Sequence, residues 1–123
     1  PNRFEFKGGN NEASVPARLP YWIRFNFGEK KKVSDVIIHV RVDGTRINGG
    51  ALKDFELYRI NNDVEQKVGN YTIDKTDDDH AYIVHFTEPV QADGFKLNAL
   101  TSQAGQIFKL NIDEVEFKMH KFR

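Results

Sequence analysis

Alternation of apolar and polar residues with a period of two is the feature that most constrains this chain. Such alternation is typical of a strand with one face buried and the other exposed to water. It recurs in six places, around residues 22–27, 36–42, 55–58, 82–86, 95–99 and 115–120. Between them, no long window keeps the period of an amphipathic helix. The pattern therefore predicts a chain built from strands.

Turn-forming residues separate these segments at near-regular intervals, at Gly28-Glu29, Asp43-Gly44, Asn61-Asn62-Asp63, Asp77-Asp78-Asp79, Glu88-Pro89 and Asp93-Gly94. Gly28 is expected to end the first strand, and the charged run after it, residues 29–32, is interpreted as a solvated turn. Short strands punctuated in this way favour a β-sandwich or barrel. Because neither a repeat nor a linker interrupts the pattern, residues 1–123 are expected to form one domain.

Composition argues against several classes of function. The chain has 18 Lys and Arg residues and 18 Asp and Glu residues, so its formal net charge is zero. A balanced charge argues against a general nucleic-acid or anionic-membrane binder. The chain contains no cysteine, which excludes disulfides and thiol catalysis. No apolar run approaches the roughly 18 residues of a membrane span.

Residues typical of catalysis do not form a recognisable motif. The four histidines show no metal-ligand spacing, and His39 and His85 are interpreted as surface residues on polar strand faces. Carboxylates are common, but no motif frames a nucleophile–base pair or a carboxylate pair. Residues 77–79 are interpreted as a hairpin tip rather than a calcium ligand cluster. The chain is therefore predicted not to be an enzyme.

Three segments taken in order resemble one family. "LPYWIRFNFGEKKKVSDVIIHV" is similar to a Trp-Ile strand followed by a hydrophobic strand, with Asn26 where an Asp is usual, and "LKDFELYRINND" and "IDEVEF" are similar to two later strands. Together they resemble the galactose-binding-like jelly roll of discoidin (coagulation factor C-type) domains and family 32 carbohydrate-binding modules. The resemblance runs from about Phe6 to Phe117. It implies an all-β, antiparallel β-sandwich.

The resemblance also implies a sugar-binding loop. Family 32 modules often carry an arginine before this loop and an Asn-Gly seven residues later, and Arg41 and Asn48-Gly49 occupy those positions. A guanidinium donates hydrogen bonds in a fixed fork and an amide both donates and accepts, which suits vicinal sugar hydroxyls. In the alternative interpretation, Arg41 makes a surface ion pair and Asn48 fits a left-handed turn before Gly49.

An apolar sugar-contacting face is expected from Tyr21 or Phe108. Galactose-binding members usually add a histidine in the loop before the Trp-Ile strand, but "NNEASVPARLPY" has none. An aromatic ring packs against the apolar face of a sugar. Phe108, in "TSQAGQIFKLN", lies near the position of the family's stacking aromatic, although it could equally be a core residue of the final sheet.

A structural calcium ion is a further implication of the resemblance. The family commonly binds it with an N-terminal turn and a carboxylate from the closing strand. "GGNNEAS" resembles that turn, so the implied ligands are Asn10, Asn11, Ser14 and Glu114. Their oxygen atoms suit calcium.

The leading hypothesis is a non-catalytic carbohydrate-binding module from a secreted, multimodular, bacterial glycan-active protein. It is expected to act outside the cell as a monomer, covalently linked to other modules. Loops at one end of the sandwich would bind galactose or N-acetylhexosamine-type glycans. The alternative is a discoidin-type protein-interaction or adhesion domain, without membrane insertion because its loops are mainly polar. A jelly-roll enzyme would need an acid–base pair or an open metal site, and no motif indicates either.

Overall fold

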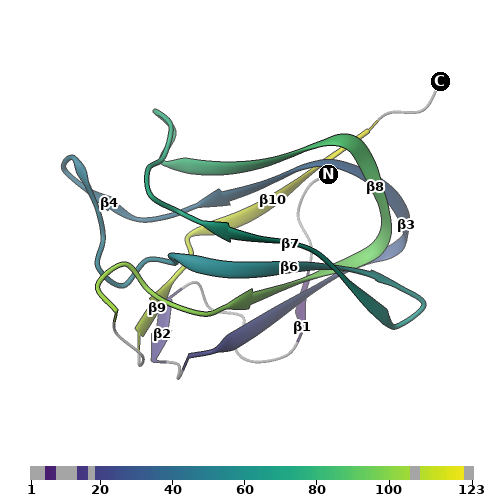
Figure 1. Ribbon diagram of the computed structural model, residues 1–123, viewed down its shortest axis with the longest axis horizontal. Coiled ribbons are helices and arrows are strands. Elements are labelled where there is room, and N and C mark those ends of the chain that lie inside the picture. Colours follow the sequence, from purple (N-terminus) through teal and green to yellow (C-terminus); the bar gives the residue numbers. More distant parts are fainter. Residues whose placement is uncertain (1–4, 8–13, 17–18, 106–108, 121–123) are drawn as a thin grey trace.

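The computed structural model describes residues 5–7, 14–16, 19–105 and 109–120, and every regular element among them is a strand (Figure 1). All pairings between these strands are antiparallel, so the predicted fold class is confirmed. The strands are β1 (Glu5–Lys7), β2 (Ser14–Pro16), β3 (Tyr21–His39), β4 (Val42–Asp43), β5 (Arg46–Ile47), β6 (Asp54–Asn61), β7 (Val64–Thr72), β8 (Ala81–Ala99), β9 (Lys109–Asn111) and β10 (Glu114–Met119).

Two long strands, β3 and β8, belong to both layers of the sandwich. They pair with each other from Tyr21 opposite Ala99 to His39 opposite Ala81, with register shifts around residues 27–30 and at residue 34. Figure 1 shows both strands curving at one end of the molecule from one layer to the other. β1, β6 and β7 extend one layer, and β10 pairs with the second half of β3 in the other. Bends of this kind let a strand change layers without losing its partner.

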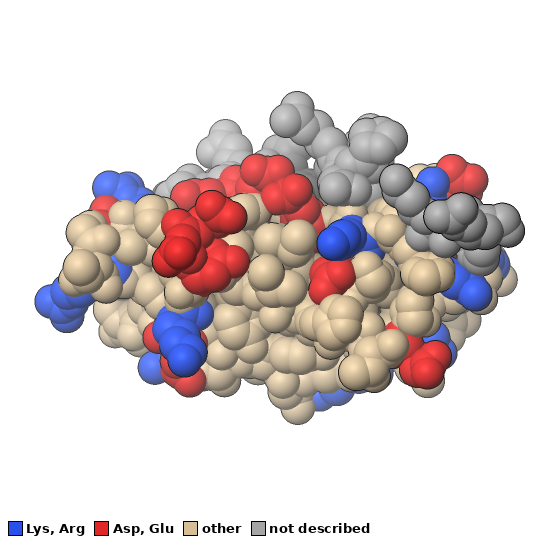
Figure 2. All heavy atoms as spheres, turned by 90° about the horizontal axis from the view of Figure 1, so that it is seen from above, with Lys and Arg blue, Asp and Glu red and all other residues tan. Residues whose placement is uncertain are grey.

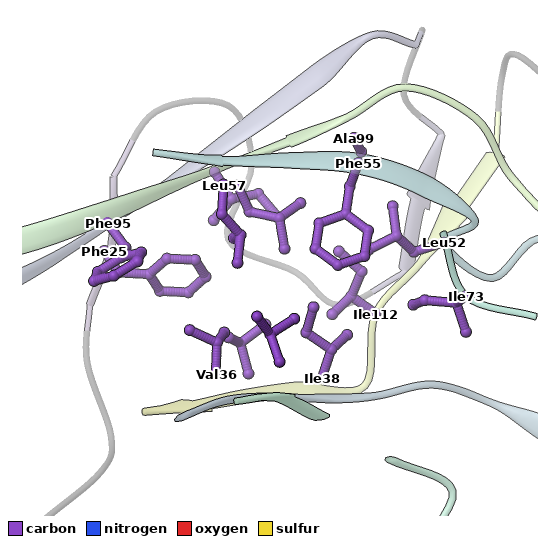
Figure 3. Close-up of a cluster of buried hydrophobic side chains, with 14 of the residues drawn as sticks. Phe25, Val36, Ile38, Leu52, Phe55, Leu57, Ile73, Phe95, Ala99 and Ile112 are labelled. Carbon is purple, nitrogen blue, oxygen red and sulfur yellow. The ribbon is translucent and has the colours of Figure 1, made fainter. Parts of the chain in front are cut away.

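The core fills the space between the layers (Figure 3). Inward-facing positions of the predicted alternation, such as Val36, Ile38, Phe55 and Leu57, are almost fully buried. Aromatic rings fill the region near the bend: the ring centroid of Phe117 lies 5.1 Å from that of Phe25 and 5.4 Å from that of Phe95. The main buried side chains are those of Phe25, Val33, Val36, Ile38, Val40, Leu52, Phe55, Leu57, Ile73, Phe95, Leu97 and Phe117.

The prediction that Gly28 ends a strand is wrong. Gly28 lies within β3 and takes a φ of 80°, a conformation that glycine adopts without steric cost. The charged run after it follows the bend rather than forming a turn between strands, and Lys31 pairs with Glu29 at 3.0 Å. Likewise, Glu88-Pro89 and Asp93-Gly94 lie inside β8.

The edge strand β7 was not predicted because its sequence lacks the expected alternation, and the short strands β1, β2, β5 and β9 were not predicted either. β7 forms the edge of its layer, and most of its side chains are exposed on both faces. By contrast, residues 77–79 form the predicted turn. The Asp77 carboxylate accepts hydrogen bonds from the backbone N–H groups of Asp79 and Ala81, at 2.9 and 3.0 Å.

Gly94 of β8 lies opposite Asn26 of β3, and a Cβ atom there would be 2.5 Å from the carbonyl oxygen of Phe25. We expect Gly94→Ala to lower the free energy of unfolding by about 1–3 kcal/mol, because the backbone must shift to relieve the overlap. Urea denaturation measures the change. Val64→Thr, at an exposed edge position, is the control and should change the free energy by no more than about 0.5 kcal/mol. Equal stability of the two variants would contradict the close packing at the bend.

The outer face of the first layer carries a hydrogen-bonded carboxylate, Glu56. It accepts hydrogen bonds from Lys67 at 2.8 Å, Asn98 at 2.9 Å and Tyr58 at 3.1 Å. The bond from Lys67, followed by that from Asn98, lowers the pKa of Glu56 from 4.5 to about 2. The folded state therefore favours the charged form of this group more strongly than the unfolded chain does.

Glu56→Gln should lower the free energy of unfolding at neutral pH by on the order of 1 kcal/mol, a value reduced by solvent screening. Because the folded pKa is depressed, this stabilisation is present above pH 4.5 and is lost as the pH falls towards about 2. Urea denaturation of both proteins across this range should show the difference shrinking with falling pH. A difference that is the same at every pH would disprove the assignment.

Candidate functional site

A short hairpin between β3 and β6 is flanked by the two residues that the sequence singled out, Arg41 and Asn48. β4 and β5 pair through Val42 opposite Ile47 and Asp43 opposite Arg46, around a turn in which Gly44 has a φ of 64°. The hairpin lies at the end of the sandwich opposite the bend in β3 and β8 (Figure 1). The segment around residues 43–50, expected to be one loop, therefore contains a hydrogen-bonded hairpin.

Arg41 and Asn48 converge on one carboxylate, that of Asp43. Its Oδ1 accepts a hydrogen bond from Arg41 Nε at 3.2 Å, and its Oδ2 accepts one from Asn48 Nδ2 at 2.7 Å. The bond from Asn48 and then that from Arg41 hold the pKa of Asp43 below its ordinary value. The Arg41 and Asp43 side chains remain 61% and 55% exposed, so both are accessible to a ligand.

Asn48 is held in place on both sides of its amide. Its Oδ1 accepts hydrogen bonds from the backbone N–H of Gly50 at 2.9 Å and from Asn111 Nδ2 at 2.8 Å. Its backbone N–H donates to the carbonyl of Arg41 at 2.9 Å. These bonds fix the orientation in which the Asn48 amide meets the surface.

The alternative interpretation of this pair is half correct. Arg41 does form an ion pair at the surface, with Asp43. Asn48, however, is not in the left-handed conformation, which non-glycine residues adopt at Asn62, Asp63 and His80 within the described chain.

A pocket of about 460 Å³ lies beside the hairpin, and Gln103 and Ala104 supply its second wall. The Gly49 carbonyl accepts a hydrogen bond from the Ala104 N–H at 2.9 Å, which ties the two walls together. Gln103 is anchored by donating to the carbonyls of Leu52 at 2.9 Å and Ile73 at 2.7 Å. The pocket is lined by Asp43, Arg46, Ile47, Asn48, Gly49, Gln103 and Ala104.

The structure brings together some of the predicted ligand-binding residues. Asn48 lines the pocket, whereas Arg41 adjoins it through Asp43. Tyr21 is not among the described lining residues; it begins β3, opposite Ala99, and packs partly against the core. Phe108 lies outside the described residues.

Sequence reasoning missed three polar lining residues: Asp43, Arg46 and Gln103. Asp43 and Arg46 flank the Gly44-Thr45 turn, so recognising a tight hairpin in "VDGTRI" would have placed them opposite each other. Gln103 has no such signal, because it is far from the hairpin along the chain.

The predicted calcium ligands are only partly described. Asn10 and Asn11 lie outside the described residues, and the backbone of Ser14 pairs with Asn111 in the β2–β9 ribbon. Glu114 begins β10 with an exposed side chain close to His39 and Glu116. The available donors, a carboxylate and backbone carbonyls, are of the kind that calcium prefers.

One face of the described structure carries charges of both signs (Figure 2). Figure 2 shows blue basic groups scattered among red acidic ones on the face seen from above, without a continuous basic area. No described helix is long and apolar enough to cross a membrane.

Several solved structures have a similar fold. A family 32 carbohydrate-binding module from Clostridium perfringens NanJ, in complex with galactose, is 29% identical with a TM-score of 0.66, over 81% of this chain and 67% of that one. The second module of this type from a GH31 protein, bound to GalNAc, is 22% identical with a TM-score of 0.71, over 94% and 72%. A GH89 module from Clostridium perfringens, in complex with GalNAc-β-1,3-galactose, is 20% identical with a TM-score of 0.63, over 81% and 66%.

A comparison with curated proteins gives no match. The model of the F5/8 type C domain, however, matches residues 3–111. This family and the similar carbohydrate-binding modules are non-catalytic, which confirms the prediction that the chain is not an enzyme. Because the match spans most of the sequence, the chain belongs to the F5/8 type C domain family.

Proposed function

We propose that this domain is a carbohydrate-binding module for glycans that end in galactose or an N-acetylhexosamine, bound at the pocket beside hairpin β4–β5. The observation that carries the proposal is the fixed network in which Arg41 and Asn48 meet on Asp43 at the pocket margin. The galactose and GalNAc complexes of similar modules support the choice of sugar.

The network offers a sugar the complementary polar groups that it needs. Two vicinal hydroxyls can donate to the Asp43 carboxylate and accept from the Arg41 guanidinium, since a hydroxyl has both roles. The Asn48 amide has a second N–H available on the nitrogen that already donates to Asp43. Because hydrogen bonds to the backbone and to Asn111 already hold this amide, little conformational entropy is lost when a sugar binds.

The apolar face of the sugar requires an apolar partner, and we propose Phe108 for this role. Ile47 and Ala104 are the largest apolar groups that line the described pocket, and neither is aromatic. In the sequence, Phe108 follows four residues after Ala104, which lines this wall. Tyr21 is the weaker of the two predicted partners, because it lies outside the described lining and packs partly against the core.

The cellular context is also part of the proposal. Similar modules carry the names of glycoside hydrolase families, GH31 and GH89. We infer that this domain is a monomeric module of a secreted, multimodular, bacterial glycan-active protein. Acting outside the cell, it would hold a covalently linked catalytic module near its substrate. Linkage converts a weak contact into a high local concentration of enzyme.

We expect selective binding to galactose- or GalNAc-terminated glycans on an array, followed by titration calorimetry with the best ligand. Arg41→Ala and Asn48→Ala should each weaken binding about tenfold or more, because each removes a hydrogen bond involving a charged or fixed group. Circular dichroism must show that each variant is folded.

Arg59→Ala is a matched control. Arg59 lies on β6, donates hydrogen bonds to Gln66 and does not line the pocket. It should bind like the wild type. If folded wild-type protein binds no glycan, or if the pocket variants bind as well as Arg59→Ala, the proposal fails and a protein-interaction role becomes the better hypothesis.

We also propose a structural calcium ion bound by Glu114 and Ser14, with Asn10 and Asn11 completing the oxygen ligands. Calcium should raise the melting temperature of the wild-type domain relative to protein in chelator, because a ligand bound only by the folded state stabilises it. Glu114→Gln should abolish this shift, whereas Glu65→Gln, on β7, should keep it. A melting temperature that calcium does not alter would refute the proposal.

A further inference from the structure

Three metal-ligating side chains lie together on β3 and β10, away from the pocket lining. His39 ends β3, directly opposite Glu114 of β10 in the antiparallel register. Glu116 lies two residues after Glu114, and alternate residues of a strand share one face. One ligand atom from each of the three lies within 4.8 Å of the other two.

The histidine ring is already oriented towards the carboxylates. His39 Nε2 lies 2.5 Å from Glu116 Oε1, and the ring also bonds the backbone carbonyl of Asp79. In metal sites, a hydrogen bond from the histidine ring to a backbone carbonyl fixes the orientation of the ring. The His39 and Glu116 side chains are 24% and 31% exposed and Glu114 is exposed, so an ion can reach all three from solution.

The cluster also needs a positive charge. Glu114 and Glu116 are two carboxylates placed on one strand face. Partial burial lowers the pKa of His39, but the bond to Glu116 and the charges of Glu116 and Glu114 outweigh that effect and raise it. A divalent cation bound between the two carboxylates would offset their mutual repulsion.

We propose that His39, Glu114 and Glu116 bind a divalent transition-metal ion, with zinc as the best fit. Zinc accepts imidazole nitrogen and carboxylate oxygen, and three protein ligands leave a fourth position for water. Tetrahedral bonds of about 2.0–2.2 Å place ligand atoms roughly 3.3–3.6 Å apart. The ligand atoms of the cluster, all within 4.8 Å of one another, are close to that spacing.

This site differs in chemistry from the calcium site proposed above. Calcium prefers six to eight oxygen ligands, whereas here one ligand in three is a nitrogen from an imidazole. Glu114 is common to both sites, but His39 belongs to the zinc site alone. The two proposals therefore give different results when His39 is replaced.

The structure supplies a matched control in His85. His85 Nδ1 lies 2.7 Å from Asp35 Oδ1, so this pair has the same two ligand types on neighbouring strands. It lacks a third described ligand and is not part of a described metal cluster. A simple histidine–carboxylate pair and the three-residue cluster can thus be compared within one protein.

The test is titration of the chelator-treated domain with Co²⁺, which reports tetrahedral coordination by its visible absorption, and with Zn²⁺ by calorimetry. We expect one equivalent to bind. His39→Gln and Glu116→Gln should each weaken binding by more than about a hundredfold, because loss of an outer-shell partner alone usually costs about 10–100-fold. Glu114→Gln, a change at an exposed position, should also weaken it, and His85→Gln should bind like the wild type.

Replacement of His39 decides between the two metal proposals, because Glu114 is common to both sites and His39 belongs to the zinc site alone. His39→Gln should lose Co²⁺ binding and should retain any calcium-dependent stabilisation. The zinc proposal is overturned if the wild type binds neither Co²⁺ nor Zn²⁺, or if His85→Gln and His39→Gln weaken binding equally.

Discussion

The pairing of β3 with β8 is the constraint on which the rest of the structure depends. Both strands bend between the layers and remain paired on either side of the bend. Consequently the end of β3, at His39, and the end of β8, at Ala99, return to the same end of the sandwich in opposite layers (Figure 1). The segments that follow these two ends are the walls of the pocket. Segments far apart in sequence thus meet because two strands share one bend.

A buried polar residue, Asn111, joins the segments at that end of the molecule. Its backbone N–H donates to the Gly50 carbonyl at 2.7 Å, its carbonyl accepts from Leu52 at 3.3 Å, and its amide donates to Asn48. A buried amide must find partners within the protein, because leaving it unpaired would cost on the order of 1–3 kcal/mol. Among the described residues, no buried side-chain nitrogen or oxygen lacks one. The hydrogen bonds of Asn111 therefore do two things: they hold the loop around Gly50 in its folded position, and they fix Asn48 at the pocket.

The sequence predicted much of the fold because burial on one face imposes a period of two. This rule identified inward residues such as Phe55 and Leu57 but could not detect β7, whose side chains are mostly exposed. It also could not recognise that a strand bends without ending, since Gly28 is equally typical of a turn and of a bend.

The candidate site was predictable only where its chemistry is local. Arg41 and Asn48 lie in one loop and match a family pattern. Gln103 is distant in sequence and reaches the pocket only because β8 ends at the same end of the sandwich. The same limit explains His39, which was interpreted as an isolated surface histidine. Its partner Glu116 is 77 positions away and becomes a neighbour through the pairing of β3 with β10.

The pocket and the proposed metal cluster share a structural neighbour, the segment that runs from β9 into β10. Asn111 bonds Asn48 at one end of this segment, and Glu114 and Glu116 meet His39 at the other. The bonds that orient Asn48 are protein–protein bonds that need no ion. A cation bound to the cluster would therefore not shape the pocket directly. It would oppose the separation of β10 from β3, and so raise the free energy of the local opening that releases the Asn111 anchor.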